Sequence, residues 1–195
     1  MRKEIVFATN NQHKLEEIKA ILGDKWKILS LNDIDCHDEI EENGATFEEN
    51  ALIKAKYIYE KYHLNCFADD SGLEVKALNN EPGIYSARYN GIDRDSEKNI
   101  DKLLKNMEGI TDRKARFRTV IAYIDRGNNY YFEGIINGDI TLKREGNGGF
   151  GYDPVFKPEG YDNTFGELGQ DIKNNISHRA IAMQKFIAFL NKQHA

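Results

Sequence analysis

Residues 66–72 have the sequence CFADDSG, in which a short apolar run is followed at once by two acids. The run predicts a buried β-strand that ends at Ala68. Consecutive residues of a strand face opposite sides, so Asp69 and Asp70 would diverge within a strand. Because the following Ser-Gly pair favours a turn, we expect one aspartate to enter a cleft from the tip of the strand while the other anchors the turn.

Predicted strands and helices alternate on both sides of this segment. Apolar spacing predicts strands at residues 4–8, 26–31 and 66–68, helices around 15–22, 46–59, 100–107 and 177–190, and a β-hairpin of 117–124 and 130–136 around residues 127–129. Thr46 and Glu49 form a capping box at the start of the second helix. A hairpin is antiparallel, so we predict an α/β fold with a mixed, twisted central sheet flanked by helices.

The composition is typical of one globular domain that spans residues 1–195. Hydrophobic residues make up 40% and charged residues 30% of the chain, and no stretch resembles a linker. We find neither an apolar run long enough to span a membrane nor a signal-peptide pattern, so we expect a cytoplasmic protein with no membrane partner. Cys36 and Cys66 fit no metal-binding spacing and are expected to be reduced thiols.

The formal net charge of −5 disfavours a nucleic-acid partner. The most basic stretch, residues 113–118, alternates as a strand does, which would place Arg116 and Arg118 together on a solvated face. A small anion bound in a local basic pocket stays compatible with this charge.

A strand-to-helix turn near the N-terminus is suited to phosphate. Such a turn offers free N–H groups and the positive end of a helix, and Lys14 adds a full charge. The turn consists of Thr9, Asn10, Asn11, Gln12, His13 and Lys14. It lacks the GxxxxGK[ST] pattern, which disfavours a Walker-type NTPase. A capped helix start with a solvated lysine is the alternative interpretation.

Carboxylates are concentrated before and after the second predicted helix. Residues 39–42 are rich in glutamate, and the Asp69–Asp70 pair follows the third strand. Mg²⁺ takes one or two carboxylates from a protein and completes its shell with water and substrate phosphates. The two acidic segments therefore suit a magnesium site, with a solvated acidic loop as the alternative.

Two further segments suit a flat, carbonyl-bearing ligand. Residues 146–154 are glycine-rich, so the backbone can pass close to a ring while Phe150 or Tyr152 stacks on it. In the last helix, His178 and Arg179 occupy the first turn, where the helix dipole disfavours cations. A bound ligand would explain this placement. Packed aromatic residues and a simple Ser177 N-cap are the alternatives.

With these segments together, the sequence resembles the inosine triphosphate pyrophosphatase family, which hydrolyses non-standard purine triphosphates. The matching strings lie in the family's order along essentially the whole chain. They are Thr9-Asn10 with Lys14, Asn43 to Phe47 with Glu49 to Ala51, Ala68 to Leu73, Pro82 to Arg88, Gly149 to Pro154, and Ser177 to Arg179. The resemblance implies two lobes around a nucleotide cleft, a Mg²⁺ cofactor and a homodimer.

The resemblance also implies a role for each site residue. Thr9 to Lys14 would hold the triphosphate, Glu42 and Asp70 would bind Mg²⁺, and Asp70 would accept the proton of the attacking water. Ser71 would bind substrate, and the nucleobase pocket would consist of Phe150, Gly151, Tyr152, Asp153, Lys173, His178 and Arg179. Asn43 stands where bacterial members usually have Thr, so Glu41 stays an alternative to Glu42 as metal ligand.

The expected reaction gives a nucleoside monophosphate and pyrophosphate from ITP, dITP or XTP. The principal alternative is a related Maf-type pyrophosphatase, which acts on modified pyrimidine or methylated nucleotides. The Ser177-His178-Arg179 string and residues 150–153 favour the purine enzyme. A nucleotide sensor without turnover is a third possibility, disfavoured because every carboxylate needed for catalysis is present.

Overall fold

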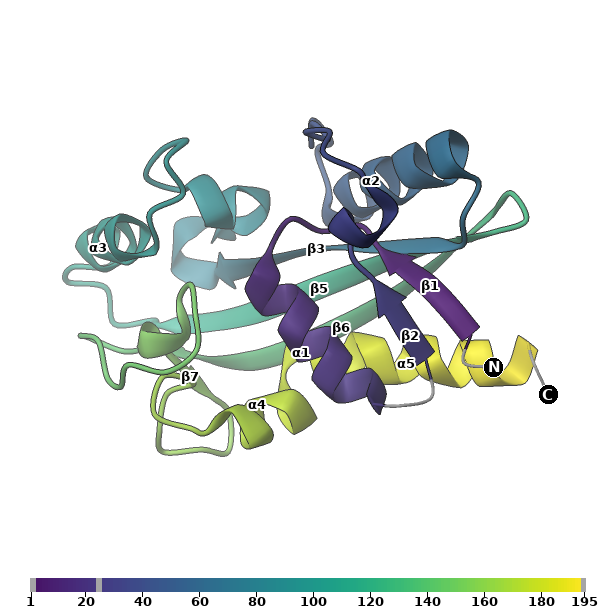
Figure 1. Ribbon diagram of the computed structural model, residues 1–195. Coiled ribbons are helices and arrows are strands. Elements are labelled where there is room, and N and C mark those ends of the chain that lie inside the picture. Colours follow the sequence, from purple (N-terminus) through teal and green to yellow (C-terminus); the bar gives the residue numbers. More distant parts are fainter. Residues whose placement is uncertain (1–2, 24–25, 194–195) are drawn as a thin grey trace. The chain divides into compact units, whose positions relative to one another are not determined.

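A computed structural model describes residues 3–23 and 26–193 of the chain (Figure 1). The helices are α1 (Gln12–Leu22), α2 (Phe47–Tyr62), α3 (Ser96–Asn106), α4 (Gln170–Ile176) and α5 (His178–Gln193). The strands are β1 (Lys3–Phe7), β2 (Trp26–Leu29), β3 (Cys66–Val75), β4 (Glu81–Pro82), β5 (Lys114–Asp125), β6 (Asn128–Ile140) and β7 (Phe156–Pro158). Within these ranges, no helix has the length and apolar character required to cross a membrane.

The strands form a mixed sheet in the order β2-β1-β3-β5-β6-β7, with β4 paired to β3. Strand β1 is parallel to both of its neighbours, with Ile5 opposite Ile28 and Phe7 opposite Phe67. Strands β4 and β7 are antiparallel to β3 and β6. The predicted mixed α/β sheet flanked by helices is confirmed.

The chain divides into two compact units, each made of segments that are far apart in sequence. The first unit consists of residues 1–70, 119–134 and 179–195, and the second of residues 71–118 and 135–178. Strands β3, β5 and β6 each contribute residues to both units. The single domain over residues 1–195 stays a prediction.

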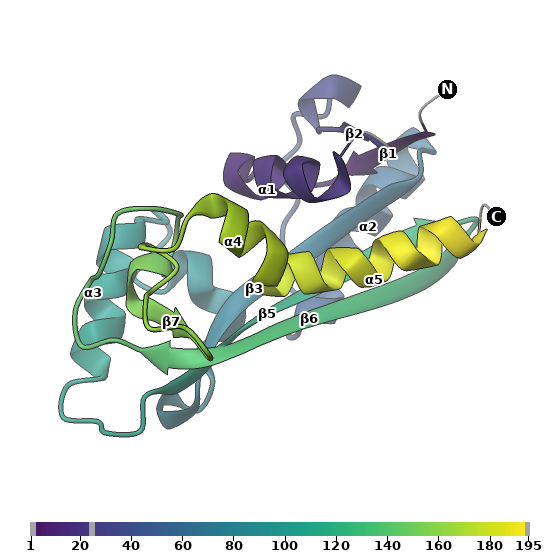
Figure 2. The ribbon, with the colours of Figure 1, turned by 90° about the horizontal axis from the view of Figure 1, so that it is seen from below.

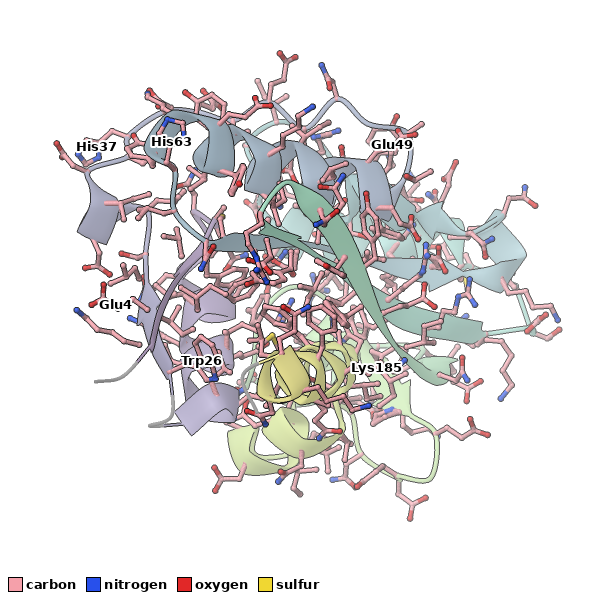
Figure 3. All side chains as sticks on the ribbon, turned by 90° about the vertical axis from the view of Figure 1, so that its right-hand side faces the viewer. Glu4, Trp26, His37, Glu49, His63 and Lys185 are labelled. Carbon is pink, nitrogen blue, oxygen red and sulfur yellow. The ribbon has the colours of Figure 1, made fainter. Side chains whose placement is uncertain are left out.

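The first unit has helices on both sides of its strands, and β1 shows why. Ile5 and Phe7 pack in one apolar cluster with residues of α1 and α5, whereas Val6 and Ala8 pack in another with residues of α2. Residues 5–8, the last part of β1 and the residue after it, are all apolar and buried, as expected for a segment covered on both faces. In Figure 3 the labelled Glu49 marks α2 on one side of the strands and Lys185 marks α5 on the other.

Helix α5 lies along the hairpin strands of the first unit (Figure 2). The ammonium of Lys185 donates to the main-chain oxygen of Glu133 in β6 at 2.6 Å. Phe186 packs against Phe67 with ring centroids 5.0 Å apart, and Phe67 stacks on Phe7 at 4.7 Å. These aromatic contacts join α5 to the centre of the sheet.

The second unit has an aromatic core of its own. Phe117 of β5 packs against Phe156 of β7 at a centroid distance of 4.5 Å, and Phe156 stacks on Phe165 at 5.7 Å. Ile100 and Leu103 of α3 are fully buried in the same cluster. The predicted apolar face of this helix is therefore confirmed.

Strand β3 differs from the sequence prediction in a way that matters for the site. We expected a strand that ends at Ala68 and a turn at Ser71 and Gly72, but β3 continues without interruption from Cys66 to Val75. The prediction that the two aspartates lie at a strand tip is therefore wrong. Charges can be buried in mid-strand when partners neutralise them, and the chain supplies such partners for Asp69 from distant helices.

Smaller differences concern turns and helix starts. The hairpin turn is formed by Arg126 and Gly127, both with positive φ, one residue before the predicted turn. Helix α4 was not predicted, and the last helix begins at His178 instead of Ser177.

Two further predictions concern single side chains. Arg116 was expected on a solvated face but is half-buried, with its Nε 2.5 Å from a Glu74 carboxylate oxygen. Both cysteines are free thiols, as predicted, and the structure shows that both are buried.

We predict that Phe67→Ala lowers the free energy of unfolding by about 3–5 kcal/mol, because it leaves a cavity between Phe7 and Phe186. Urea unfolding followed by circular dichroism measures this change. Tyr131→Ala is the control, since that side chain is 46% exposed and its loss should change stability by less than about 0.5 kcal/mol. Equal effects of the two substitutions would contradict the packing described for β3.

Candidate active site

Asp69 is a fully buried carboxylate neutralised by two cations of the first unit. Its Oδ2 lies 3.0 Å from Lys14 Nζ of α1 and 3.6 Å from Arg179 Nε of α5. Arg179 is itself buried and forms an ion pair with Glu17 of α1. Buried charges require such partners, so these contacts fix α1 and α5 against β3.

Asp70 faces the opposite side of β3, toward α2. Its Oδ2 accepts a hydrogen bond from Asn50 Nδ2 at 3.1 Å. Burial raises the pKa of Asp70 to about 6, with a further rise from the nearby Glu42 carboxylate, while Lys54 and Lys14 act against the shift. Asp70 thus has the pKa of a group that can exchange a proton near neutral pH.

Lys54 of α2 links the two acidic segments. Its Nζ donates to the main-chain oxygen of Asp69 at 2.5 Å and lies 2.8 Å from a Glu42 carboxylate oxygen. Burial disfavours its charge, but the carboxylates of Asp69, Glu42 and Asp70 outweigh burial, so the pKa of Lys54 is raised. The group therefore stays a cation beside the acids.

The pKa of Lys14 shifts in the opposite direction to that of Lys54. Burial is the main reason that its pKa is lowered, and repulsion from Lys54 and Arg179 adds to this effect. Attraction to Asp69 and Asp70 opposes the shift without cancelling it. An anion beside these three cations would stabilise their charged forms.

The turn that precedes Lys14 is ordered by its own side chains. Thr9 Oγ1 accepts a hydrogen bond from Asn11 N at 3.1 Å, and Asn11 Oδ1 caps α1 by accepting from Lys14 N at 3.2 Å. Asn10, Gln12 and His13 are exposed. The predicted phosphate-binding turn is therefore an accessible helix N-terminus that leads to a partly buried lysine.

The second unit contains a buried ion pair in the predicted nucleobase segment. Lys173 Nζ lies 2.7 Å from Asp153 Oδ2 and 4.3 Å from the centre of the Phe150 ring. The same Asp153 oxygen accepts a hydrogen bond from Phe150 N at 2.9 Å. Gly149 has φ +71°, and a Cβ there would lie 2.0 Å from this oxygen, so the turn requires glycine.

The other predicted residues of the second unit have distinct surroundings. Tyr152 is buried in the aromatic core, and its hydroxyl donates to the Ser86 main-chain oxygen at 2.6 Å. Of the two aromatic residues considered for stacking, Phe150 is the one that is partly exposed. The His178 imidazole stacks on the Phe117 ring at 4.8 Å, and Ser71 is partly exposed within β3.

The carboxylates of Glu42 and Asp70 are the side chains that could hold a hard divalent cation at this site. Among the described residues, no group of three or more His, Cys, Asp or Glu side chains is placed to hold a metal. Glu42 and Asp70 are nevertheless close enough for their charges to interact. Two carboxylates of this kind fit Mg²⁺, which obtains its remaining ligands from water and substrate phosphates.

Comparison with known proteins identifies the family. The model of the Ham1 family matches residues 5–189. The chain belongs to the Ham1 family. A dITP/XTP pyrophosphatase of Flavobacterium johnsoniae is 50% identical over 96% of this chain and 97% of its own length, and one of Porphyromonas gingivalis is 49% identical over 96% and 97%. The solved structure of the Staphylococcus aureus Ham1 protein has a TM-score of 0.89 at 42% identity and covers 98% of this chain and 100% of its own. The predicted family is thereby confirmed.

Three polar residues of this Ham1-family site were missed by the sequence analysis. Glu17, Asn50 and Lys54 are each within a helix whose apolar face was recognised. The available signal was a polar residue on that face: Asn50 adjoins Ala51, and Lys54 follows one turn later. Arg179 was noted as unfavourable in a first helical turn, and Glu17 supplies an anionic partner from within the chain.

The raised pKa of Asp70 makes stability depend on pH in the metal-free protein. Because the folded state binds this proton more tightly than the unfolded chain, the contribution of Asp70 to stability falls as pH rises from about 4 through about 6. We predict that Asp70→Asn removes this dependence and makes the protein up to about 3 kcal/mol more stable at pH 8 relative to the unchanged protein. Urea unfolding in EDTA between pH 4.5 and 8 measures the difference, and parallel curves would contradict the shift.

Proposed function

We propose that this Ham1-family protein hydrolyses ITP, dITP and XTP between the α and β phosphates, which releases a monophosphate and pyrophosphate. The observation that carries this proposal is about 50% identity, over nearly the full length of both chains, to proteins named dITP/XTP pyrophosphatase. The reaction would remove non-standard purine nucleotides from the nucleotide pool.

We propose Mg²⁺ as the cofactor, with Glu42 and Asp70 as its protein ligands. Their mutual repulsion, which contributes to the raised pKa of Asp70, supports this assignment, because a cation between them would relieve it. When bound, Mg²⁺ supplies positive charge to the phosphates and makes a coordinated water more acidic. Glu41 is the exposed neighbour and the alternative ligand.

We assign the triphosphate to the N-terminus of α1 and to the cations beside β3. Free main-chain N–H groups of a helix start bind phosphate oxygens, and here residues 9–13 are largely exposed. Lys14 and Lys54 would neutralise charge that develops on the leaving pyrophosphate. The pKa of Lys14, lowered mainly by burial, supports this role, because a bound anion would favour the charged form of the lysine.

Asp70 is the group that we assign to activation of the attacking water. With a pKa of about 6 its carboxylate is mostly ionised at neutral pH and is able to accept a proton. Its hydrogen bond from Asn50 restricts its orientation. Asp69 is less suitable as a base, because its carboxylate is fully buried and paired with Lys14 and Arg179.

We assign base recognition to Phe150, Lys173, His178 and Arg179, with Ser71 as a further substrate contact. The partly exposed Phe150 ring suits stacking on a purine. Hypoxanthine and xanthine carry a carbonyl at position six that would accept from Arg179 and His178, whereas adenine presents an amino group there. Donor facing donor leaves both groups unpaired, which reduces kcat/KM by roughly 10⁴ in sites built this way.

For assembly and location we propose a cytoplasmic homodimer. The net charge of −5 supports a small nucleotide as the partner in preference to a nucleic acid.

The proposed specificity predicts rapid pyrophosphate release from ITP, dITP and XTP and release from ATP that is slower by roughly 10⁴ in kcat/KM. A coupled pyrophosphate assay with and without Mg²⁺, at matched nucleotide concentrations, measures both rates. Activity should be lost in EDTA and restored by Mg²⁺. Equal rates on ITP and ATP, or orthophosphate as the sole phosphate product, would eliminate the proposal.

Asp70→Asn should reduce kcat on ITP by at least roughly 10²-fold, because an amide neither accepts the proton nor supplies a carboxylate to the cation. Nucleotide binding, measured by equilibrium dialysis, should stay detectable. Asp112→Asn is the matched control, since that carboxylate is 44% exposed and pairs with Lys76 at 3.1 Å. Retained turnover in Asp70→Asn would remove Asp70 from its assigned role.

A further inference from the structure

Asn50 is a buried polar residue on the apolar face of α2. Its side chain is 2% exposed, and it lies between Phe47 and Ala51 on a face that otherwise packs in the core. A buried amide without hydrogen-bond partners would destabilise the fold, so the partners of Asn50 are informative. An apolar side chain of similar size would have avoided this requirement.

The nitrogen and the oxygen of the Asn50 side-chain amide form hydrogen bonds with different partners. Nδ2 donates to Asp70 Oδ2 at 3.1 Å, and Oδ1 accepts from Gly44 N at 2.8 Å. A main-chain N–H is only a donor, so the oxygen of the amide must face Gly44 and the nitrogen must face Asp70. The orientation of the amide is therefore determined by its surroundings.

Gly44 allows this approach because it has no side chain. A Cβ at this position would lie 2.8 Å from Asn50 Oδ1 and 2.7 Å from Glu49 Cβ. The next amide, Ala45 N, donates to a Glu49 carboxylate oxygen at 2.6 Å. Two successive main-chain amides, two and three residues after Glu42, are thus bound to the first turn of α2.

Initiation of α2 does not require Asn50. Thr46 Oγ1 already caps the helix by accepting from Glu49 N at 3.1 Å, and Glu49 completes the capping arrangement through Ala45. The bonds of Asn50 serve a different purpose. One reaches the carboxylate assigned as base, and the other reaches the loop that carries the assigned metal ligand Glu42.

We propose that Asn50 is a positioning residue that fixes the Asp70 carboxylate and the Glu42 loop at the spacing required to bind a divalent cation and direct the attacking water. This inference rests on the proposed function. Residues that orient metal ligands typically affect metal affinity or activity by roughly 10–100-fold when they are replaced. Asn50 has the contacts of such a residue on both sides.

The test compares Asn50→Leu with the matched control Asn99→Leu. Asn99 is also a buried helical asparagine that binds a loop. It accepts from Asn90 N at 2.8 Å and donates to Ala87 O at 3.0 Å, and both of these partners are main-chain atoms, not carboxylates. For each variant we would measure kcat and KM for ITP and the dissociation constant of Mn²⁺, from the electron paramagnetic resonance signal of the free ion.

We expect Asn50→Leu to lower kcat and to weaken Mn²⁺ binding, each by roughly 10–100-fold, with KM for ITP nearly unchanged. Asn99→Leu should lose stability but keep both properties. Gly44→Ala displaces the hydrogen bond between Gly44 N and Asn50 Oδ1 without altering Asn50. It should also lower kcat and weaken Mn²⁺ binding. This variant therefore tests the positioning role of Asn50 if Asn50→Leu does not fold. Unchanged kcat and Mn²⁺ affinity in the Asn50 or Gly44 variant, or an equal loss in Asn99→Leu, would overturn the inference.

These outcomes separate the inference from the proposed function. If the unchanged protein binds Mn²⁺ but releases no pyrophosphate from ITP, the proposed function fails, and the ratio of Mn²⁺ affinities still decides the role of Asn50. If the unchanged protein binds no Mn²⁺, the positioning role is overturned, whatever its activity.

Discussion

Two consecutive carboxylates are buried in the middle of β3, and the helices of the first unit supply partners to both. Asp69 lies against Lys14 and Arg179, and the Asp69 main-chain oxygen receives the Lys54 ammonium. An uncompensated charge in such surroundings would destabilise the fold by several kcal/mol. The helices that supply these cations, α1, α2 and α5, therefore contribute to the stability of β3.

The alternation of a β-strand gives the two aspartates different properties. Asp69 faces α1 and α5, where cations compensate it within the chain. Asp70 faces α2, where an amide is its partner and Glu42 adds repulsion. One carboxylate is thus stabilised as an anion, and the other is left with a raised pKa and a capacity for proton transfer. The difference arises from one residue of offset along a strand.

The sequence allowed the mixed α/β class, most elements and the family to be predicted, because apolar periodicity and local motifs report burial directly. It did not reveal that β3 continues through Asp69 and Asp70, since two acids after an apolar run normally end a strand. The missing information was tertiary: Lys14 and Arg179 are 55 and 110 residues away from Asp69 along the chain. Glu17 and Lys54 were missed for the same reason. Their partners lie on other elements, and a polar residue on an apolar helix face does not by itself identify those partners.

In the second unit, the ion pair of Lys173 and Asp153 has a consequence for how tightly a ligand can be held. The Asp153 oxygen that receives the ammonium also holds the Phe150 main-chain N–H, and Gly149 leaves room for it. These contacts fix the main chain of the loop at Phe150. A purine that stacks on this ring, as we propose, would therefore require little further ordering of the loop, and less of the stacking energy would be lost to conformational entropy.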